Sequence, residues 1–140
     1  MKMGLDTVAT PPRTLLLVDD ERSILASLKR LLRNEGYNIL TAESGLAGLD
    51  QMASHDVGVV VSDGLMHGLT GAEFLLEVKA RFPQTVRILL TGFTDPDVVH
   101  DAIKTCQLFK FLPKPWDDEE LRQALRAAFR LYESQHHHVG

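Results

Sequence analysis

Short apolar runs, each the length of a β-strand, alternate along this chain with stretches whose apolar residues recur at helical spacing. The runs cover residues 15–18, 38–41, 57–62, 86–90 and 109–112. The stretches between and after them indicate helices, the last of which runs from Asp117 to about Ser134. The second of these helices is marked by Leu46, Leu49 and Met52, and the fourth is expected to have Val98, Val99, Ala102 and Ile103 on its inner face. Five strands that are each followed by a helix predict a (βα)5 arrangement.

The first, third and fourth apolar runs are continuous rather than alternating, which is typical of strands that are covered on both faces. A parallel sheet between two layers of helices has this property. We therefore expect a flavodoxin-like, doubly wound α/β domain with the strand order 2-1-3-4-5. The predicted domain occupies residues 14–134, between a flexible leader at 1–13 and a flexible tail at 135–140.

Composition excludes several classes of function. With 15 Lys and Arg against 19 Asp and Glu, the net charge of -4 leaves no electrostatic footprint for nucleic acid or an anionic membrane. No apolar run reaches the roughly 18 residues that span a bilayer. The one cysteine, Cys106, is expected to be a buried small side chain. These features favour a cytoplasmic protein that binds neither a membrane nor nucleic acid directly.

Four of the predicted strands end in side chains that carry chemistry. These are Asp19 and Asp20 after the first, Asp63 after the third, Thr91 after the fourth and Lys114 after the fifth. The carboxyl ends of parallel strands share one edge of a sheet, and ligands bind there. Each side chain alone has an ordinary explanation, such as helix capping or a surface lysine. Together they indicate one site.

The chemistry of this predicted site favours phosphoryl groups. Three carboxylates at close range repel one another, and Mg²⁺, which prefers oxygen ligands, would relieve that repulsion. An aspartate in the middle of such an edge can act as a nucleophile toward phosphorus. Lys114 would then neutralise phosphoryl oxygens, and the Thr91 hydroxyl would donate a hydrogen bond to one.

With these motifs the chain resembles the receiver domains of two-component response regulators, over residues 13 to 133. The resemblance depends on LLVDDE at 16–21, VVSDGLM at 60–66, Gly71, LLTG at 89–92 and FLPKPW at 111–116. It implies that Asp63 is the phosphoacceptor and that Asp19, Asp20 and Asp63 hold Mg²⁺ with the backbone carbonyl of Leu65. It also implies a Thr91 switch hydroxyl, a Lys114 contact with the phosphoryl group, an aromatic switch at Phe111 and a cis Lys114-Pro115 peptide bond.

The resemblance implies partners as well. The phosphoryl donor would be a histidine kinase or a phosphotransfer protein, and the chain would have no turnover beyond self-phosphorylation and slow autodephosphorylation. Homodimers and effectors would bind a face formed by the fourth helix, the fifth strand and the fifth helix. This face is expected to contain Asp97, Asp101, Lys104, Lys110, Asp118, Arg122 and Arg126. Residues 109–118 look like receivers that precede output domains, including HD-GYP phosphodiesterases, and no output domain lies in this chain.

Some residues depart from the family pattern. The loop at 66–71 lacks the proline that commonly follows Met66, and His67 in this loop is expected to be exposed to solvent. His136, His137 and His138 are expected to belong to a solvated tail. Two alternatives to a receiver stay open at this point. A phosphohydrolase would need a carboxylate two residues after Asp63, where Leu65 stands, and an interaction module would need no phosphorylation at all.

Overall fold

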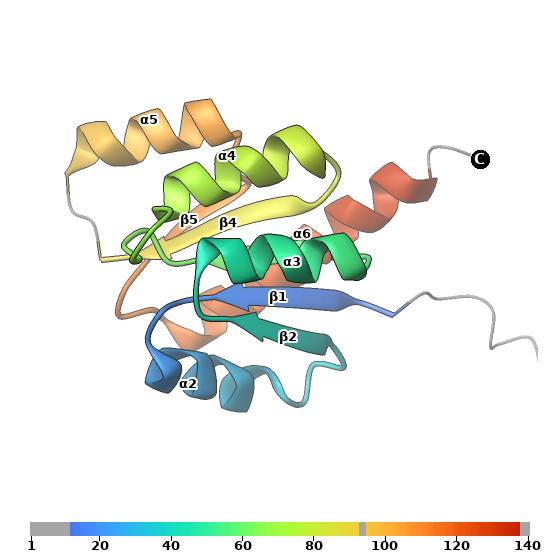
Figure 1. Cartoon of the computed structure of the whole chain (residues 1–140). Coiled ribbons are helices and arrows are strands. Elements are labelled where there is room, and N and C mark those ends of the chain that lie inside the picture. Colours follow the sequence, from blue (N-terminus) through green and yellow to red (C-terminus); the bar gives the residue numbers. More distant parts are fainter. Residues whose placement is uncertain (1–11, 93–94, 138–140) are drawn as a thin grey trace, which may run out of the picture.

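Five parallel strands form a single sheet in the computed structural model, which describes residues 12–92 and 95–137 (Figure 1). The strands are β1 (Thr14–Val18), β2 (Asn38–Ala42), β3 (Val59–Ser62), β4 (Val86–Thr91) and β5 (Lys110–Pro113). The helices are α2 (Arg22–Leu32), α3 (Gly45–Ser54), α4 (Gly71–Arg81), α5 (Pro96–Cys106) and α6 (Asp118–His137). The sheet order β2-β1-β3-β4-β5 confirms the predicted (βα)5, doubly wound fold.

Helices cover both faces of the sheet, as the continuous apolar runs predict. Leu15 and Leu17 of β1 face one core together with residues of α2 and α6. Leu16 and Val18 face the other core, which contains residues of α3, α4 and α5. Neighbouring residues of one strand thus serve two cores, because successive side chains of a strand point to opposite faces.

The register of the central strands aligns their carboxyl ends. Val18 of β1 is paired with Ser62 of β3, and Ser62 with Leu89 of β4. Beyond these pairs, the backbone N–H of Asp63 donates to the carbonyl of Val18 at 2.9 Å. The residues that follow β1 and β3 therefore begin side by side at one edge of the sheet.

Two predicted core positions of α5 are wrong. Val98 and Ile103, expected on its inner face, are 45% and 39% exposed, whereas Ala102 and Cys106 are buried. At about 100° per residue, Ile103 points away from the stripe of Ala102 and Cys106, whereas Val98 lies on that stripe but in the first turn of the helix, where it is left partly exposed. The buried Cys106 confirms the expectation from the sequence.

In α3, Leu46 also differs from its predicted place in the helical pattern, since 68% of it is exposed. The inner face of this helix is made by Gly45, Gly48, Leu49 and Met52. A Cβ on Gly48 would lie 2.9 Å from the ring of Phe74, so α3 approaches α4 through its glycines and leaves Leu46 outside.

A salt bridge joins the first and the last parts of the chain that the structure describes. Arg13, counted with the leader in the sequence, donates two hydrogen bonds to the Glu133 carboxylate, at 2.8 and 2.9 Å, and lies over the Phe129 ring. α6 extends to His137, beyond the predicted end near Ser134. The leader up to residue 11 and the tail from His138 lie outside the described residues. No helix in the described ranges has the length and apolar character needed to cross a bilayer.

Candidate functional site

Three carboxylates converge where β1 and β3 end. Asp19, Asp20 and Asp63 each offer an oxygen atom, and these oxygens lie within 4.8 Å of one another. Asp19 and Asp63 are buried, at 2% and 7% exposure, while Asp20 is partly open to solvent. The structure thus brings together the acidic residues that the ends of the strands predicted.

A lysine that follows β5, at the same edge of the sheet, lies between two of these acids. The ammonium of Lys114 is 2.7 Å from Oδ2 of Asp19 and 3.2 Å from Oδ1 of Asp63. The backbone N–H of Lys114 donates to the carbonyl of Thr91 at 3.0 Å, which attaches the residue after β5 to the end of β4. The Lys114-Pro115 bond is cis, as the resemblance implied.

Thr91 and Phe111 share the face of the sheet that α3, α4 and α5 cover. Leu89 is paired with Phe111 across β4 and β5, and Leu89 belongs to the core on this face. Thr91 stands two residues after Leu89, so its side chain points to the same face. Thr91 is 1% exposed and Phe111 is half-buried, which places the two predicted switch residues as diagonal neighbours.

The charges of the site shift the pKa values of its groups. Burial and the charge of Asp19 raise the pKa of Asp63, against the opposing effects of Lys114 and a hydrogen bond from the backbone of Leu65. Burial would lower the pKa of Lys114, but its hydrogen bond to Asp19 and the nearby carboxylates outweigh that effect and raise it. Three acids against one ammonium leave an excess of negative charge, so the site is suited to a cation.

The oxygen donors present fit Mg²⁺ in kind. A magnesium site uses one or two carboxylates, and it completes its coordination with water and phosphate oxygens. Two of the three aspartates are held in place by other contacts. Oδ1 of Asp19 accepts from the backbone N–H of Glu21 at 2.9 Å, and Asp63 accepts from Leu65. Carboxylates that are oriented before a cation binds lose less conformational freedom when it does.

The loop after Asp63 is packed too closely for any residue but glycine at one point. A Cβ on Gly71 would lie 1.9 Å from the backbone oxygen of Asp63. The N–H of Gly71 also donates to the carbonyl of Gly64 at 3.1 Å, and a capping box between Thr70 and Glu73 starts α4 directly afterwards. The start of α4 therefore supports the backbone of Asp63.

His67 has a contact that the sequence did not indicate. Its side chain is fully exposed, as expected, yet Nδ1 lies 3.0 Å from Oδ2 of Asp20, which also accepts from the backbone N–H of His67 at 3.3 Å. The two residues are 47 positions apart in the chain. No pattern within a single sequence reports a pair of that separation across two loops.

A comparison with protein families matches the response regulator receiver domain over residues 15–126. The chain belongs to this family. Among curated relatives, the receiver is 35% identical over 115 residues to the hydrogenase transcriptional regulatory protein HoxA of Cupriavidus necator. It is 37% identical over 116 residues to the transcriptional regulatory protein GlrR of Escherichia coli. The matches cover 82% and 81% of this chain but only 24% and 26% of those proteins.

Solved receiver structures resemble the chain over most of its length. The signal receiver domain of an HD domain-containing protein from Pseudomonas fluorescens has a TM-score of 0.86 and 35% identity, covering 89% of this chain and 99% of that one. A response regulator receiver domain protein from Clostridium thermocellum has a TM-score of 0.82 and 33% identity, covering 88% and 98%. The chain thus matches whole receiver domains and about a quarter of the curated transcriptional regulators.

Proposed function

We propose that this receiver accepts a phosphoryl group on Asp63 from a histidine kinase or a phosphotransfer protein. The observation that carries the proposal is the position of the Asp63 carboxylate. It lies 3.2 Å from the ammonium of Lys114 and within 4.8 Å of oxygens from Asp19 and Asp20. A phosphoryl group on Asp63 would therefore have positive charge on one side and the acidic cluster on the other.

In the proposed step, a carboxylate oxygen of Asp63 attacks phosphorus and forms an acyl phosphate. The bond from phosphorus to the donor's imidazole nitrogen breaks, and its electron pair stays on that nitrogen. The Lys114 ammonium turns from Asp63 to the phosphoryl oxygens as they approach. Asp19, Asp20, Asp63 and the Leu65 carbonyl would hold Mg²⁺, which when bound neutralises charge on the transferred group.

Phosphorylation would then be read through Thr91 and Phe111. The phosphoryl group offers the Thr91 hydroxyl a charge-assisted hydrogen bond, and an inward Thr91 leaves space for the neighbouring Phe111 ring. Next to them lies the α5-β5-α6 face, where we place a homodimer or effector contact. Arg126, which the sequence assigned to this face, instead pairs with Glu35 beside α2 at 2.9 Å.

In this proposal the protein acts as a signalling domain and not as a phosphatase. An enzyme that turns over an aspartyl phosphate needs an acid or base close to its nucleophile, and two residues after Asp63 stands Leu65, whose side chain is 61% exposed. We expect only self-phosphorylation from small donors and slow autodephosphorylation. The output domain or effector lies outside this chain, and the free, buried Cys106 suits the reducing cytoplasm in which we place the transfer.

Labelling with acetyl phosphate and Mg²⁺, followed by intact-mass spectrometry, tests the proposal. The wild type should gain one phosphoryl mass per chain and Asp63→Asn none. Asp56→Asn, at an exposed aspartate before β3, is the matched control and should label like the wild type. Labelling of Asp63→Asn would contradict the assignment of the site. Continuous release of phosphate would indicate a phosphatase, and no labelling of the wild type would indicate an interaction module.

A further inference from the structure

Asp20, the most exposed of the three clustered carboxylates, has a polar partner outside the cluster. Its Oδ2 accepts from Nδ1 of His67 at 3.0 Å and from the backbone N–H of His67 at 3.3 Å. An ionised carboxylate only accepts hydrogen bonds, so Nδ1 carries the proton in this pair. Within residues 12–92 and 95–137, Oδ1 of Asp20 accepts no hydrogen bond. One oxygen of Asp20 is therefore held, and the other is left for a cation.

His67 stands behind Asp20 and is not one of the clustered ligands. Among the described residues, the ligand atoms that lie within 4.8 Å of one another belong to Asp19, Asp20 and Asp63. The His67 side chain approaches from the solvent, where it is fully exposed, while 23% of the Asp20 side chain is exposed. Hydrogen bonds from outside a metal site orient its carboxylates, and their loss typically weakens metal binding by about 10–100-fold. His67 has the place of such an outer partner.

Both hydrogen bonds depend on the departure from the family pattern at position 67. A proline there has neither a backbone N–H nor a side-chain donor, so it could make neither contact. The same loop contains Gly64 and Gly68, and Gly68 has a φ of 80°. Glycine residues give a loop more conformational freedom than other residues do, and proline would reduce that freedom. The contact of His67 with Asp20 therefore supplies a restraint that this loop lacks in its backbone.

Three contacts fix the loop between β3 and α4. The glycines at its two ends are joined by the backbone hydrogen bond described above. In its middle, Met66 is 9% exposed and packs in the core that α3, α4 and α5 cover. The next residue, His67, is joined to Asp20 at the end of β1. The segment from Leu65 to His67 is thus held between the core and β1, and it includes the Leu65 carbonyl that we assign to Mg²⁺.

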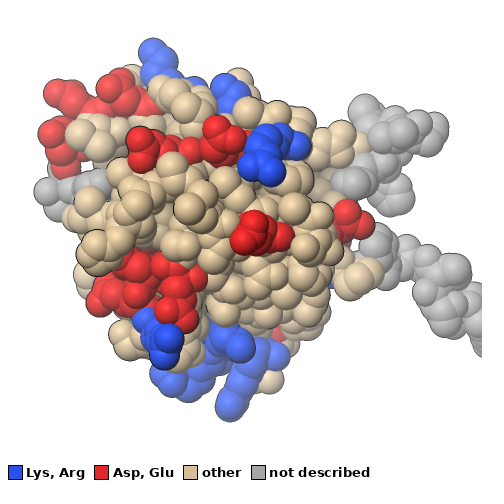
Figure 2. Space-filling view, in the orientation of Figure 1, with Lys and Arg blue, Asp and Glu red and all other residues tan. Residues whose placement is uncertain are grey.

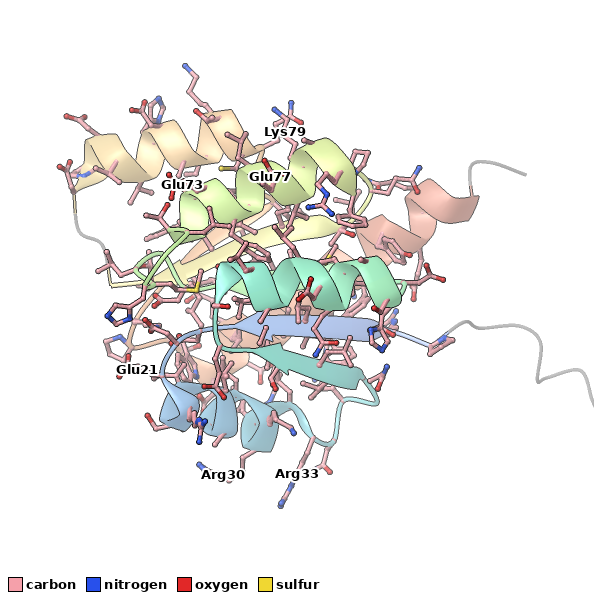
Figure 3. All side chains as sticks on the ribbon, viewed as in Figure 1. Glu21, Arg30, Arg33, Glu73, Glu77 and Lys79 are labelled. Atoms are coloured by element: carbon pink, nitrogen blue, oxygen red, sulfur yellow. The ribbon has the colours of Figure 1, made fainter. Side chains whose placement is uncertain are left out.

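The charges around Asp20 make this restraint important. Figure 2 shows acidic side chains gathered beside the start of α2, and Figure 3 places Glu21 there. Arg30 and Arg33 lie at the other end of α2. In the described ranges, no lysine or arginine forms a salt bridge with Asp20. Repulsion from the other carboxylates favours rotation of Asp20 toward solvent. The two hydrogen bonds from His67 oppose such a rotation.

We propose that His67 is a positioning residue for the metal site. It holds the Asp20 carboxylate and the Leu65 carbonyl in the arrangement that Mg²⁺ requires, without contacting the cation itself. The identity of the cation rests on the proposed function, which this role of His67 deepens. A site that is oriented before binding loses less conformational freedom when the cation enters, so its affinity is higher.

Calorimetric titration of Mg²⁺ into the full chain, without a phosphoryl donor, tests this role. His67→Ala should weaken binding by about tenfold, at the lower end of the range for outer partners because the imidazole is exposed. His67→Asn should restore most of the affinity, because its amide N–H can take the place of Nδ1–H. His67→Gln places the amide one carbon farther from the backbone and should resemble His67→Ala. Both amides are neutral, so a change of charge cannot explain a difference between them.

A second histidine of the chain provides the matched control. His55 is exposed, and its Nδ1 contacts the backbone carbonyl of Gln51 at 3.1 Å, so it resembles His67 in everything except its distance from the carboxylates. His55→Ala should leave the Mg²⁺ affinity unchanged. Thermal unfolding in the presence of a chelator should give similar midpoints for all His67 variants, because substitutions at exposed positions change stability little. A loss of affinity then reports on the site and not on folding.

Several outcomes would overturn this role of His67. Equal affinity of His67→Ala and wild type would show that the contact does not position the site, and tighter binding would show that His67 competes with the cation for Asp20. Equal losses in His67→Asn and His67→Ala, or a wild type that binds no Mg²⁺, would also contradict it. The proposed function fails separately. A chain that shows the expected His67 dependence but does not label on Asp63 keeps the metal site and loses the phosphotransfer.

Discussion

Lys114 supplies the positive charge nearest to the acidic cluster, so the site without a metal depends on it. Its ammonium contacts Asp19 and Asp63, both of which are buried. Removal of one partner of a buried ion pair leaves the other charge without compensation, which costs more than the pair itself contributes. The stability of the metal-free protein should therefore respond strongly to this residue.

We predict that Lys114→Met lowers the free energy of unfolding in the presence of a chelator. The expected loss is about 3 kcal/mol, the lower end for a broken buried pair, because 17% of the Lys114 side chain is exposed. Added Mg²⁺ should stabilise the variant more than the wild type, since it replaces the missing charge. Urea unfolding with and without the metal measures both effects. Lys104→Met, at an exposed lysine of α5, is the control and should change neither.

The raised pKa of Asp63 gives a second prediction. Burial and Asp19 raise this pKa above its ordinary value of 3.8, so the folded state binds the proton more tightly than the unfolded state does. The resulting stabilisation is complete below pH 3.8 and is lost as the pH rises through the folded-state pKa. Without metal, Asp63→Asn should therefore be more stable than the wild type at pH 7, and the difference should shrink on acidification.

Urea unfolding across this pH range, with a chelator present, measures the difference. Asp56→Asn changes an exposed aspartate and should show no such pH dependence. Equal stability of Asp63→Asn and wild type at every pH would mean that Lys114 compensates Asp63 completely.

Among individual residues, the sequence predicts the site side chains that directly follow strands, and it misses a contact between side chains of two loops. Asp19, Asp63 and Lys114 follow apolar runs, and a parallel sheet brings such positions together whatever lies between them. The contact between His67 and Asp20 depends on how two loops approach each other, and hydrophobic periodicity carries no information about that.

Among the helices, α5 is attached mainly through its carboxyl end. Nε of the buried Arg87 on β4 donates to the carbonyl of Cys106 at 3.0 Å, and Nη2 donates to that of Gln107 at 3.4 Å. Lys79 of α4 donates to the carbonyl of Thr105. The last carbonyl groups of a helix have no partner within it, so two cations from two elements complete the hydrogen bonds of this one.

Arg87→Met should therefore destabilise the protein although it removes a buried charge. The carbonyl groups of Thr85, Cys106 and Gln107 lose their donors in the interior, and each unsatisfied buried group costs about 1–3 kcal/mol. We expect a total loss of about 2–4 kcal/mol, because water reaches part of the site. Chemical denaturation measures it. An unchanged midpoint would show that Arg87 contributes no net stability.

The kind and order of the elements could be predicted because they follow from apolar periodicity. The inner face of α5 could not be predicted in the same way. The apolar stripe that the sequence suggests is wider than the one that the helix buries, since it includes Val98, Val99, Ala102 and Ile103. Which part of that stripe meets the sheet depends on the approach of α4. The role of Arg87 is hidden for a similar reason, because a single charged residue inside the apolar run 86–90 does not disturb the pattern.

In the whole molecule, the site lies at the edge of the sheet where the strands end, and α6 extends past the strands at the opposite edge (Figure 1). The fold was predictable as a whole because the central strands are mostly apolar and the helices that follow them have apolar residues at helical spacing. The remaining length of the curated relatives, about three quarters, lies outside the region that this chain matches. In the proposed function, a signal from Asp63 would reach an output through the surface of the domain.

Thr91→Ala tests whether phosphorylation reaches that surface. The variant should still label on Asp63, because the nucleophile, Lys114 and the other carboxylates are intact. The change that phosphorylation causes on the α5-β5-α6 face should be smaller in this variant, because the proposed link through the Thr91 hydroxyl is gone. An allosteric coupling between two sites is typically about 1–3 kcal/mol. NMR spectra with beryllofluoride measure the shifts of α5 and Phe111. Wild-type shifts in the variant would exclude Thr91 as the link.

The attachment of α5 also determines how far each part of it can travel. With Thr105, Cys106 and Gln107 held by Lys79 and Arg87, any displacement that starts at the β4–α5 connection pivots about the carboxyl end. The helix is then a lever arm whose fulcrum is at Gln107, and its amplitude is greatest at Pro96. A partner that contacts the first turn of α5 experiences the full displacement, whereas one that contacts the last turn experiences almost none.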